Sequence, residues 1–129
     1  MIAPGPRPVT TFCIDDQACF RAAVRELIAA TPGFALIGEA ESAEDGIAQL
    51  RSLRPDLVLI DVGLQGMDGF DAAALIAVQR RDMVLLLMSA DPIGPPPNPW
   101  PRGAEIRFVA KQELCPRMLL DLWHGRRTR

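Results

Sequence analysis

Five polar residues stand at the ends of apolar runs, and their side chains together could transfer a phosphoryl group. Asp15 and Asp16 follow the first run, Asp61 and Ser89 each end a later one, and Lys111 follows the last. Carboxylate oxygens are suitable ligands for Mg²⁺. A carboxylate can also attack phosphorus to give an aspartyl phosphate. A metal ion, an ammonium group and a hydroxyl group can neutralise the phosphoryl oxygens during that step.

Each of these residues has a simpler explanation when it is taken alone. An Asp after a strand is more often a turn residue or a helix cap, a Ser there is a common loop residue, and a Lys is usually a solvated charge. Lysine is rare in this chain, however: of 14 basic residues, Lys111 is the single Lys and the others are Arg. The combination at four separate run ends therefore favours a joint function.

The elements that must position these residues alternate between strand and helix. Strands are predicted at 8–14, 34–40, 57–61, 83–89 and 106–110. The third and fourth runs are apolar without a break, which is typical of strands buried on both faces of a parallel sheet. This alternation predicts an α/β fold with a doubly wound, flavodoxin-like sheet in the order 2-1-3-4-5.

Helices are predicted from apolar spacing and from capping residues. Ser42 caps the second helix, which Arg54 and Pro55 end, and the third helix begins at Asp68 or Gly69. The inward residues expected for the third helix are Phe70, Ala73, Ala74, Ala77 and Val78. A last helix is predicted to begin at Pro116. The residues that it is expected to direct toward the core are Met118, Leu119, Leu122 and Trp123.

The segment between the fourth and fifth strands departs from this alternation. Residues 91–101 contain six of the twelve prolines of the chain. Each proline removes an amide donor and clashes with the preceding helical turn, at a cost of about 3 kcal/mol in a helix interior. We therefore expect the fourth helix to be missing or irregular, with an extended segment in its place. Trp100 is either an exposed contact residue or fills the space that a helix would occupy, and the second is favoured.

The predicted strand order brings the polar residues to one edge of the sheet. Asp15 and Asp16 lie at the end of the first strand and Asp61 at the end of the third, on either side of the topological switch point. Ser89 and Lys111 follow on the next two strands, beside Asp61. We therefore expect Asp61 to be the phosphoacceptor and the three carboxylates to require a cation, Mg²⁺.

Composition limits the class of protein. The 129 residues are 49% hydrophobic and 23% charged, which is typical of one globular domain, and no apolar run approaches the roughly 20 residues of a membrane span. The net charge of −2 and the scattered arginines do not predict direct binding to nucleic acid. Cys13, Cys19 and Cys115 form no paired framework, so reduced core thiols and a cytoplasmic location are expected.

The same motifs resemble the receiver domain of bacterial two-component response regulators. The resemblance rests on residues 11–16, 57–62, 67–69, 88–90 and 108–111 and extends over nearly the whole chain. It implies that Asp61 accepts phosphate from a histidine kinase or a phosphotransfer protein, and that Asp15, Asp16, Asp61 and the Gly63 carbonyl hold Mg²⁺. It also implies that Ser89 and Lys111 bind the phosphoryl group and that Phe108 is the aromatic switch residue.

Some residues depart from the family pattern. Gln65 and Gln112 replace two prolines that are usual in the loops after the phosphoacceptor and after the Lys. Residues 1–8 are expected to form a flexible arm, residues 9–124 the receiver domain, and residues 125–129 a basic tail. Because few residues follow the last helix, the output is expected to be a partner protein unless the chain is a fragment.

Two other functions compete with this one. The first is a receiver-like interaction module that binds its partner through the proline tract without phosphate; the presence of all five polar residues counts against it. The second is an enzyme of similar topology. A flavin-binding protein would need a phosphate loop where Asp15 and Asp16 stand, and an aspartyl-phosphate hydrolase would need an acid at Gly63. We therefore expect a switch protein that is not an enzyme.

Overall fold

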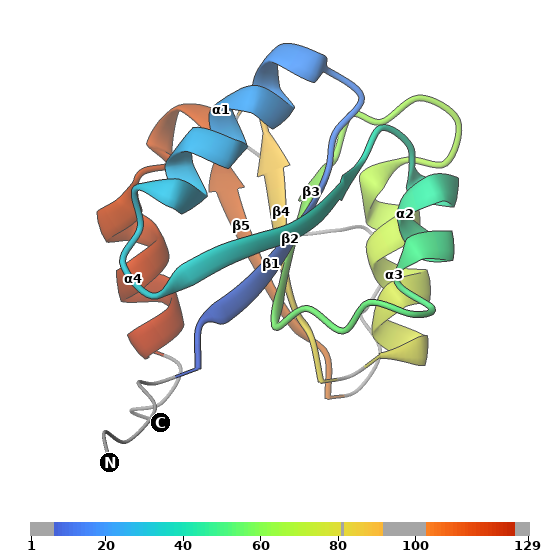
Figure 1. The fold of residues 1–129 in the computed structure, drawn as a ribbon. Helices are drawn as coiled ribbons and strands as arrows, with labels where there is room; N and C mark the ends of the chain where they lie inside the picture. Colours follow the sequence, from blue (N-terminus) through green and yellow to red (C-terminus); the bar gives the residue numbers. More distant parts are fainter. Residues whose placement is uncertain (1–6, 81, 92–102, 126–129) are drawn as a thin grey trace.

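The strands of the protein form one parallel sheet. The computed structural model describes residues 7–80, 82–91 and 103–125. The sheet has the order β2-β1-β3-β4-β5, as predicted (Figure 1). Its strands are β1 (Val9–Ile14), β2 (Phe34–Ala40), β3 (Leu57–Asp61), β4 (Val84–Ser89) and β5 (Glu105–Ala110). The predicted fold class and strand order are therefore confirmed.

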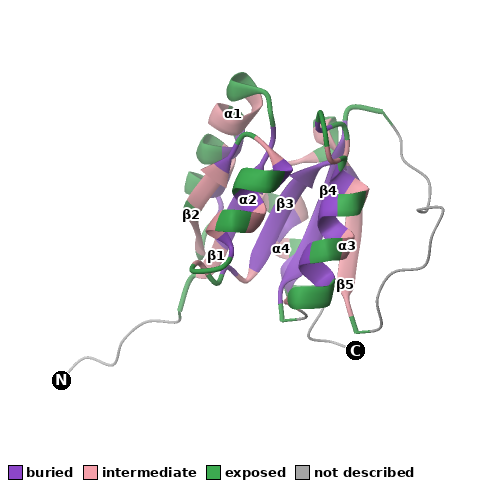
Figure 2. Cartoon of the chain, turned by 90° about the vertical axis from the view of Figure 1, so that its right-hand side faces the viewer, coloured by how far each residue is buried: buried purple, intermediate pink, exposed green. Residues whose placement is uncertain are grey.

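Helices cover both faces of the sheet. Those on one face are α1 (Ala18–Ala29) and α4 (Pro116–Gly125), and those on the other are α2 (Ala43–Gln49) and α3 (Gly69–Gln79) (Figure 1). A short 3₁₀ turn (Lys111–Glu113) links β5 to α4. Each face has its own hydrophobic cluster, and the central strands β3 and β4 are buried along their whole length, as Figure 2 shows.

Local chemistry explains where the two helices on the α2–α3 face begin. The Ser42 hydroxyl accepts a hydrogen bond from the backbone N–H of Asp45, and the Asp68 carboxylate accepts one from that of Asp71. Both are N-caps that satisfy otherwise unpaired amides. The helix α2 ends at Gln49, earlier than the predicted stop at Arg54 and Pro55, and the chain continues in turns before β3.

The predicted inward face of α3 is partly wrong. Its buried apolar residues include Ala72 and Ile76, which the prediction left out, whereas Val78 is 60% exposed and Leu75 is 43% exposed. The cause is the apolar run over 72–78, which offers no single stripe from which the buried face can be identified.

The thiol prediction is also partly wrong. Cys13 is buried in β1, and burial is the main reason why the pKa of its thiol rises to about 12. Cys19 and Cys115 are exposed, because the first turn of α1 and the loop before α4 turn these side chains away from the sheet.

The connection from β4 to β5 is described only at its two ends. Residues 90–91 and 103–104 contain no helix, and the proline tract with Trp100 lies outside the described residues, as do residues 1–6 and 126–129. Among the described residues no peptide bond is cis, so the peptide before Gln112 is trans. No helix in the described ranges combines the length and apolar character that a membrane span requires.

The pairing of β2 with β1 contains an irregularity. Thr11 pairs with Leu36 and Phe12 pairs with Gly38, so Ile37 has no partner residue in β1. This extra residue is a β-bulge in the outermost strand at this end of the sheet.

At the opposite ends of the strands from the polar residues, Asp56 joins β1 to β3. Its carboxylate accepts hydrogen bonds from the backbone N–H and the hydroxyl of Thr10, at 2.9 and 3.0 Å, and from Arg7 at 2.9 Å. Burial alone would raise the pKa of Asp56, but these hydrogen bonds outweigh it, so the pKa lies below its ordinary value.

We expect Asp56→Asn to destabilise the fold by about 1–2 kcal/mol at pH 7, because the charge-assisted hydrogen bonds are lost. Because the pKa of Asp56 is lower in the folded state than in the unfolded state, its ionised form stabilises the fold at any pH above the unfolded-state pKa. This stabilisation is lost as the pH falls through the folded-state pKa. The difference between variant and parent in urea denaturation should therefore shrink from pH 7 to about pH 3. Asp121→Asn, at a 75% exposed side chain, is the control and should change little at either pH. A constant difference would contradict the linkage.

Candidate functional site

Three carboxylates meet at the carboxyl ends of β1 and β3. These strands are neighbours with Ile14 paired to Ile60, so the residues that follow, Asp15 and Asp61, emerge side by side. Asp15, Asp16 and Asp61 each place a carboxylate oxygen within 4.8 Å of the others. Asp15 and Asp61 are buried and Asp16 is exposed. The parallel sheet thus creates a cluster of negative charge at its topological switch point.

Lys111 supplies the counter-charge from the end of β5. Its ammonium lies 2.8 Å from Asp15 Oδ2 and 3.5 Å from Asp61 Oδ1. It also lies over the Phe20 ring, 4.1 Å from the centroid, in cation–π geometry. Two carboxylates and an aromatic face from α1 thus hold the amine over the acidic cluster.

Asp61 lies in a crowded electrostatic environment. Burial raises the pKa of Asp61 most, and the charges of Asp15 and Asp16 add to this effect; the backbone N–H of Gly63 and the ammonium of Lys111 oppose it, and the net direction is upward. The Gly63 N–H donates to Asp61 Oδ1 at 3.2 Å. Negative charge here is therefore costly until a cation offsets it.

The donors at this cluster fit a hard metal ion. Asp15 Oδ1 accepts a hydrogen bond from the backbone N–H of Gln17 at 2.8 Å. Asp15 Oδ2 is buried, and its partner among the described residues is the Lys111 ammonium at 2.8 Å. Three carboxylates whose oxygens lie within 4.8 Å of one another form the all-oxygen donor set that Mg²⁺ prefers.

Ser89 and Phe108 lie on the two strands beyond β3. Ser89 ends β4, is buried, and its hydroxyl accepts a hydrogen bond from the backbone N–H of Asp91 at 3.2 Å. Phe108, in β5, is half-buried against the α2–α3 face of the sheet, and its ring centroid is 6.5 Å from that of Phe70. The structure thus places Ser89 at the same sheet edge as Asp61, and Phe108 further down β5.

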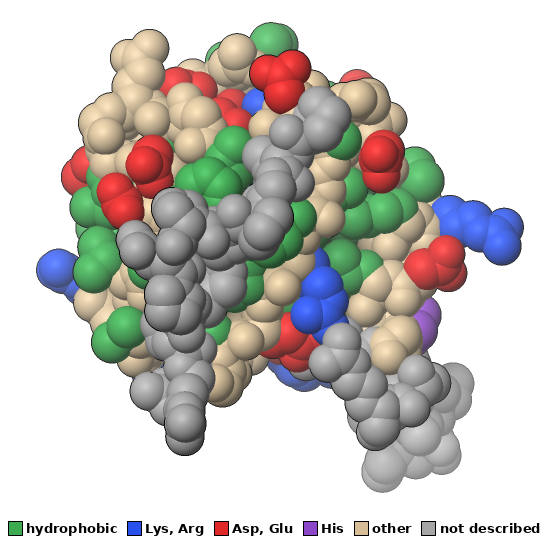
Figure 3. Space-filling model, turned by 180° about the vertical axis from the view of Figure 1, so that it is seen from behind, with side chains coloured by type: hydrophobic (Ala, Val, Ile, Leu, Met, Phe, Trp, Pro, Cys, Tyr) green, Lys and Arg blue, Asp and Glu red, His purple; other side chains and the backbone are tan. Residues whose placement is uncertain are grey.

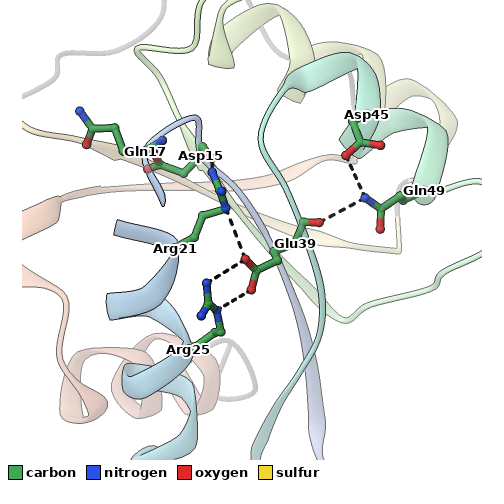
Figure 4. A network of polar contacts seen from close by, with 7 residues as sticks. All are labelled: Asp15, Gln17, Arg21, Arg25, Glu39, Asp45 and Gln49. Atoms are coloured by element: carbon green, nitrogen blue, oxygen red, sulfur yellow. Dashed lines mark hydrogen bonds and ion pairs between the residues drawn. The ribbon is translucent and has the colours of Figure 1, made fainter. Parts of the chain in front are cut away.

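A polar network behind the acidic loop was missed by the sequence reasoning (Figure 4). Arg21 donates to the backbone carbonyl of Asp15 at 2.7 Å and lies 3.3 Å from Glu39. Arg25 makes two contacts with the same Glu39 carboxylate. Gln49 donates to the Glu39 carbonyl and so extends the network to α2. The available signal was the pair of arginines four residues apart on α1, but their acceptors lie on other elements.

Arg21 is expected to position the acidic loop. Arg21→Met should weaken Mg²⁺ binding by about tenfold, because the loss of a charged hydrogen bond to the Asp15 carbonyl frees the loop that carries two of the carboxylates. Titration of Mg²⁺ followed by the intrinsic fluorescence or amide shifts of the chain measures this.

Arg25→Met is the matched control. It removes a partner of Glu39 from the same helix, but among the described residues the Arg25 side chain forms hydrogen bonds and an ion pair with Glu39 alone and none with the acidic loop. If both variants lose the same metal affinity, the effect arises from Glu39 and α1 and not from the bond to Asp15.

Comparison with known proteins matches more than half of this chain to one protein family. Residues 11–92 match the family described as "Response regulator receiver domain". The nitrate/nitrite response regulator protein NarL of Escherichia coli (strain K12) is 41% identical over 64 residues, which are 50% of this chain and 30% of that protein. Protein-glutamate methylesterase/protein-glutamine glutaminase 2 of Anaeromyxobacter dehalogenans is 33% identical over 86 residues, 67% of this chain and 25% of that protein.

Solved structures show the same fold. The response regulator domain of Thermotoga maritima CheB superposes with a TM-score of 0.73 at 16% identity, covering 92% of this chain and 96% of that one. A CheY-like receiver domain protein of Methanospirillum hungatei gives a TM-score of 0.72 at 16% identity, covering 92% and 93%. At this identity the likeness concerns the fold alone. The chain also spans only about a quarter to a third of the two curated relatives above.

Proposed function

Because the chain belongs to the response regulator receiver family of two-component systems, we propose that Asp61 accepts a phosphoryl group from a histidine kinase or a phosphotransfer protein. The observation that carries this proposal is the position of Asp61 at the switch point of the sheet, where its carboxylate lies within 4.8 Å of those of Asp15 and Asp16 and its Oδ1 lies 3.5 Å from the Lys111 ammonium. The residue roles below are part of the same proposal.

In the proposed reaction a carboxylate oxygen of Asp61 forms a bond to phosphorus while the bond from phosphorus to the donor atom breaks. The Lys111 ammonium, now 3.5 Å from Asp61 Oδ1, offsets charge on the phosphoryl oxygens. The Ser89 hydroxyl, at the end of the neighbouring strand, donates to one of those oxygens. Phe108 responds as the aromatic switch residue.

Asp15, Asp16 and Asp61 would hold Mg²⁺, together with the Gly63 carbonyl. When bound, the ion supplies positive charge next to the entering phosphoryl group. The fold holds the three carboxylates together at a net electrostatic cost, which the Lys111 ammonium, 2.8 Å from Asp15 Oδ2 and 3.5 Å from Asp61 Oδ1, offsets only in part. This arrangement supports a divalent requirement.

The output of this switch is proposed to be a downstream protein in the cytoplasm. The relatives named above are longer than this chain, so what those proteins act on is not carried over to it. On the face that Figure 3 shows, the described Lys and Arg side chains stand at separate places. This dispersion, with the net charge of −2, supports a protein partner over nucleic acid. The proposed divisions are an arm over 1–8, the receiver domain over 9–124 and a tail over 125–129.

The direct test is incubation of the purified chain with Mg²⁺ and a small phosphodonor, followed by intact-mass measurement. One phosphoryl group should be gained with Mg²⁺, and chelation of the metal should prevent the gain. An unlabelled chain that still captures its partner would favour instead a module that binds without phosphate.

A further inference from the structure

A second polar site lies at the other end of the sheet. A pocket of about 180 Å³ opens between the C-terminal ends of α2 and α3, which lie side by side in Figure 2. Its lining consists of Ile47, Leu50, Arg51, Arg54, Ile76, Gln79 and Arg80. The acidic cluster lies at the carboxyl ends of the strands, whereas these helix ends lie at the amino ends, so the two sites are separate.

The three arginines of this pocket differ in how far the fold uses them. Arg80 donates to the Leu50 carbonyl at 3.0 Å and lies 3.5 Å from the exposed Asp82. Its Nη2 is buried and has no hydrogen-bond partner among the described residues. Arg51 and Arg54 are exposed, and no described residue forms an ion pair or a side-chain hydrogen bond with either of them.

A purely structural role accounts for only part of this cluster. A cation at a helix C-terminus stabilises the partial negative charge of the last carbonyls, and Arg80 does so for α2. Arg51 and Arg54 make no such hydrogen bond within the described chain, so their charges add to that of Arg80 without an acceptor. The pocket is thus lined by three arginines, of which only Arg80 has an acidic partner among the described residues, the exposed Asp82, and an anion that entered the pocket would offset the remaining positive charge.

We propose that this pocket binds a small oxyanion of the phosphate class. Guanidinium groups donate two parallel hydrogen bonds to phosphate, and Arg51, Arg54 and Arg80 approach the pocket from two helix ends. Its volume is below the range of about 300–1,000 Å³ typical of drug-sized ligands, so it suits a phosphate group and not a nucleotide. The rest of the lining is partly apolar, and because Arg80 is largely buried beside it, an ion pair with its guanidinium would be less screened by water than one with the exposed Arg51 or Arg54.

The test is a titration of the chain with inorganic phosphate at constant ionic strength, without Mg²⁺, followed by the methyl resonances of Ile47 and Ile76. We expect saturable shifts with phosphate and with sulfate, and none when chloride replaces them. In Arg51→Gln/Arg54→Gln the affinity should fall by about tenfold or more, since two charged donors are removed. Arg117→Gln, at a side chain 90% exposed on α4, should bind like the parent.

Two results would overturn the proposal. The first is a methyl shift that follows ionic strength alone, and the second is equal affinity in the double variant and the parent. The methyl resonance of Ile60, beside Asp61, shows whether phosphate enters the acidic site instead. The single variants Arg51→Gln and Arg54→Gln are measured alongside. If the double variant does not fold, the affinities of the single variants still test the proposal.

Discussion

Asp61→Asn is expected to abolish the gain of a phosphoryl group when the chain is incubated with Mg²⁺ and a phosphodonor. The amide lacks the negative oxygen that attacks phosphorus, and Asp61 is the member of the acidic cluster that ends β3, with its Oδ1 3.5 Å from the Lys111 ammonium. Intact-mass measurement over a time course gives the labelled fraction directly. We expect complete loss, because the acceptor atom itself is changed.

Asp68→Asn is the matched control, since it makes the same chemical change a short distance along the chain. Asp68 caps α3 through its side chain, and Asn caps helices about as well as Asp, so the fold should be preserved. This variant should be labelled like the parent. Labelling of Asp61→Asn at the parental rate would show that another residue is the acceptor.

Gly69→Ala is expected to have the largest effect on stability. A Cβ at Gly69 would meet the backbone carbonyl oxygen of Asp61 and would lie 2.6 Å from the Cα of Val62. Neither atom belongs to a flexible side chain, so the first turn of α3 must move away from the end of β3. Overpacking of this kind costs about 1–3 kcal/mol or more, which exceeds the gain of roughly 1 kcal/mol from replacing Gly by Ala in a helix. Urea denaturation should show a clear net loss of unfolding free energy.

The control for this prediction is Gly63→Ala, in the same loop. Its added Cβ would meet only the two carboxylate oxygens of Asp61, at 3.8 Å, which is ordinary van der Waals contact. Gly63 also has no positive φ, so we expect a change within about 0.5 kcal/mol. Equal stabilities of the two variants would mean that the contact between α3 and β3 relaxes freely.

The strands and the site residues could be predicted from the sequence where an unbroken apolar run ends on a polar residue. The apolar runs that end at Asp61 and Ser89 give both the strands and the residues at their ends, and parallel pairing then brings those ends together. The inward face of α3 could not be read because residues 72–78 are apolar throughout. The bond from Arg21 to the Asp15 carbonyl could not be read either, since it depends on how α1 packs against β1 and β2.

The β-bulge at Ile37 affects whether the edge strand β2 can pair with a strand of another molecule. An outermost strand presents unpaired N–H and C=O groups, and a regular one is a template for a strand of another molecule. The extra residue in β2 interrupts the regular spacing of those groups and increases the local twist. A second chain would therefore meet an edge that it can pair with for only a few residues. We therefore expect the irregularity, which costs the sheet part of its own ladder, to disfavour aggregation by strand addition at the β2 edge.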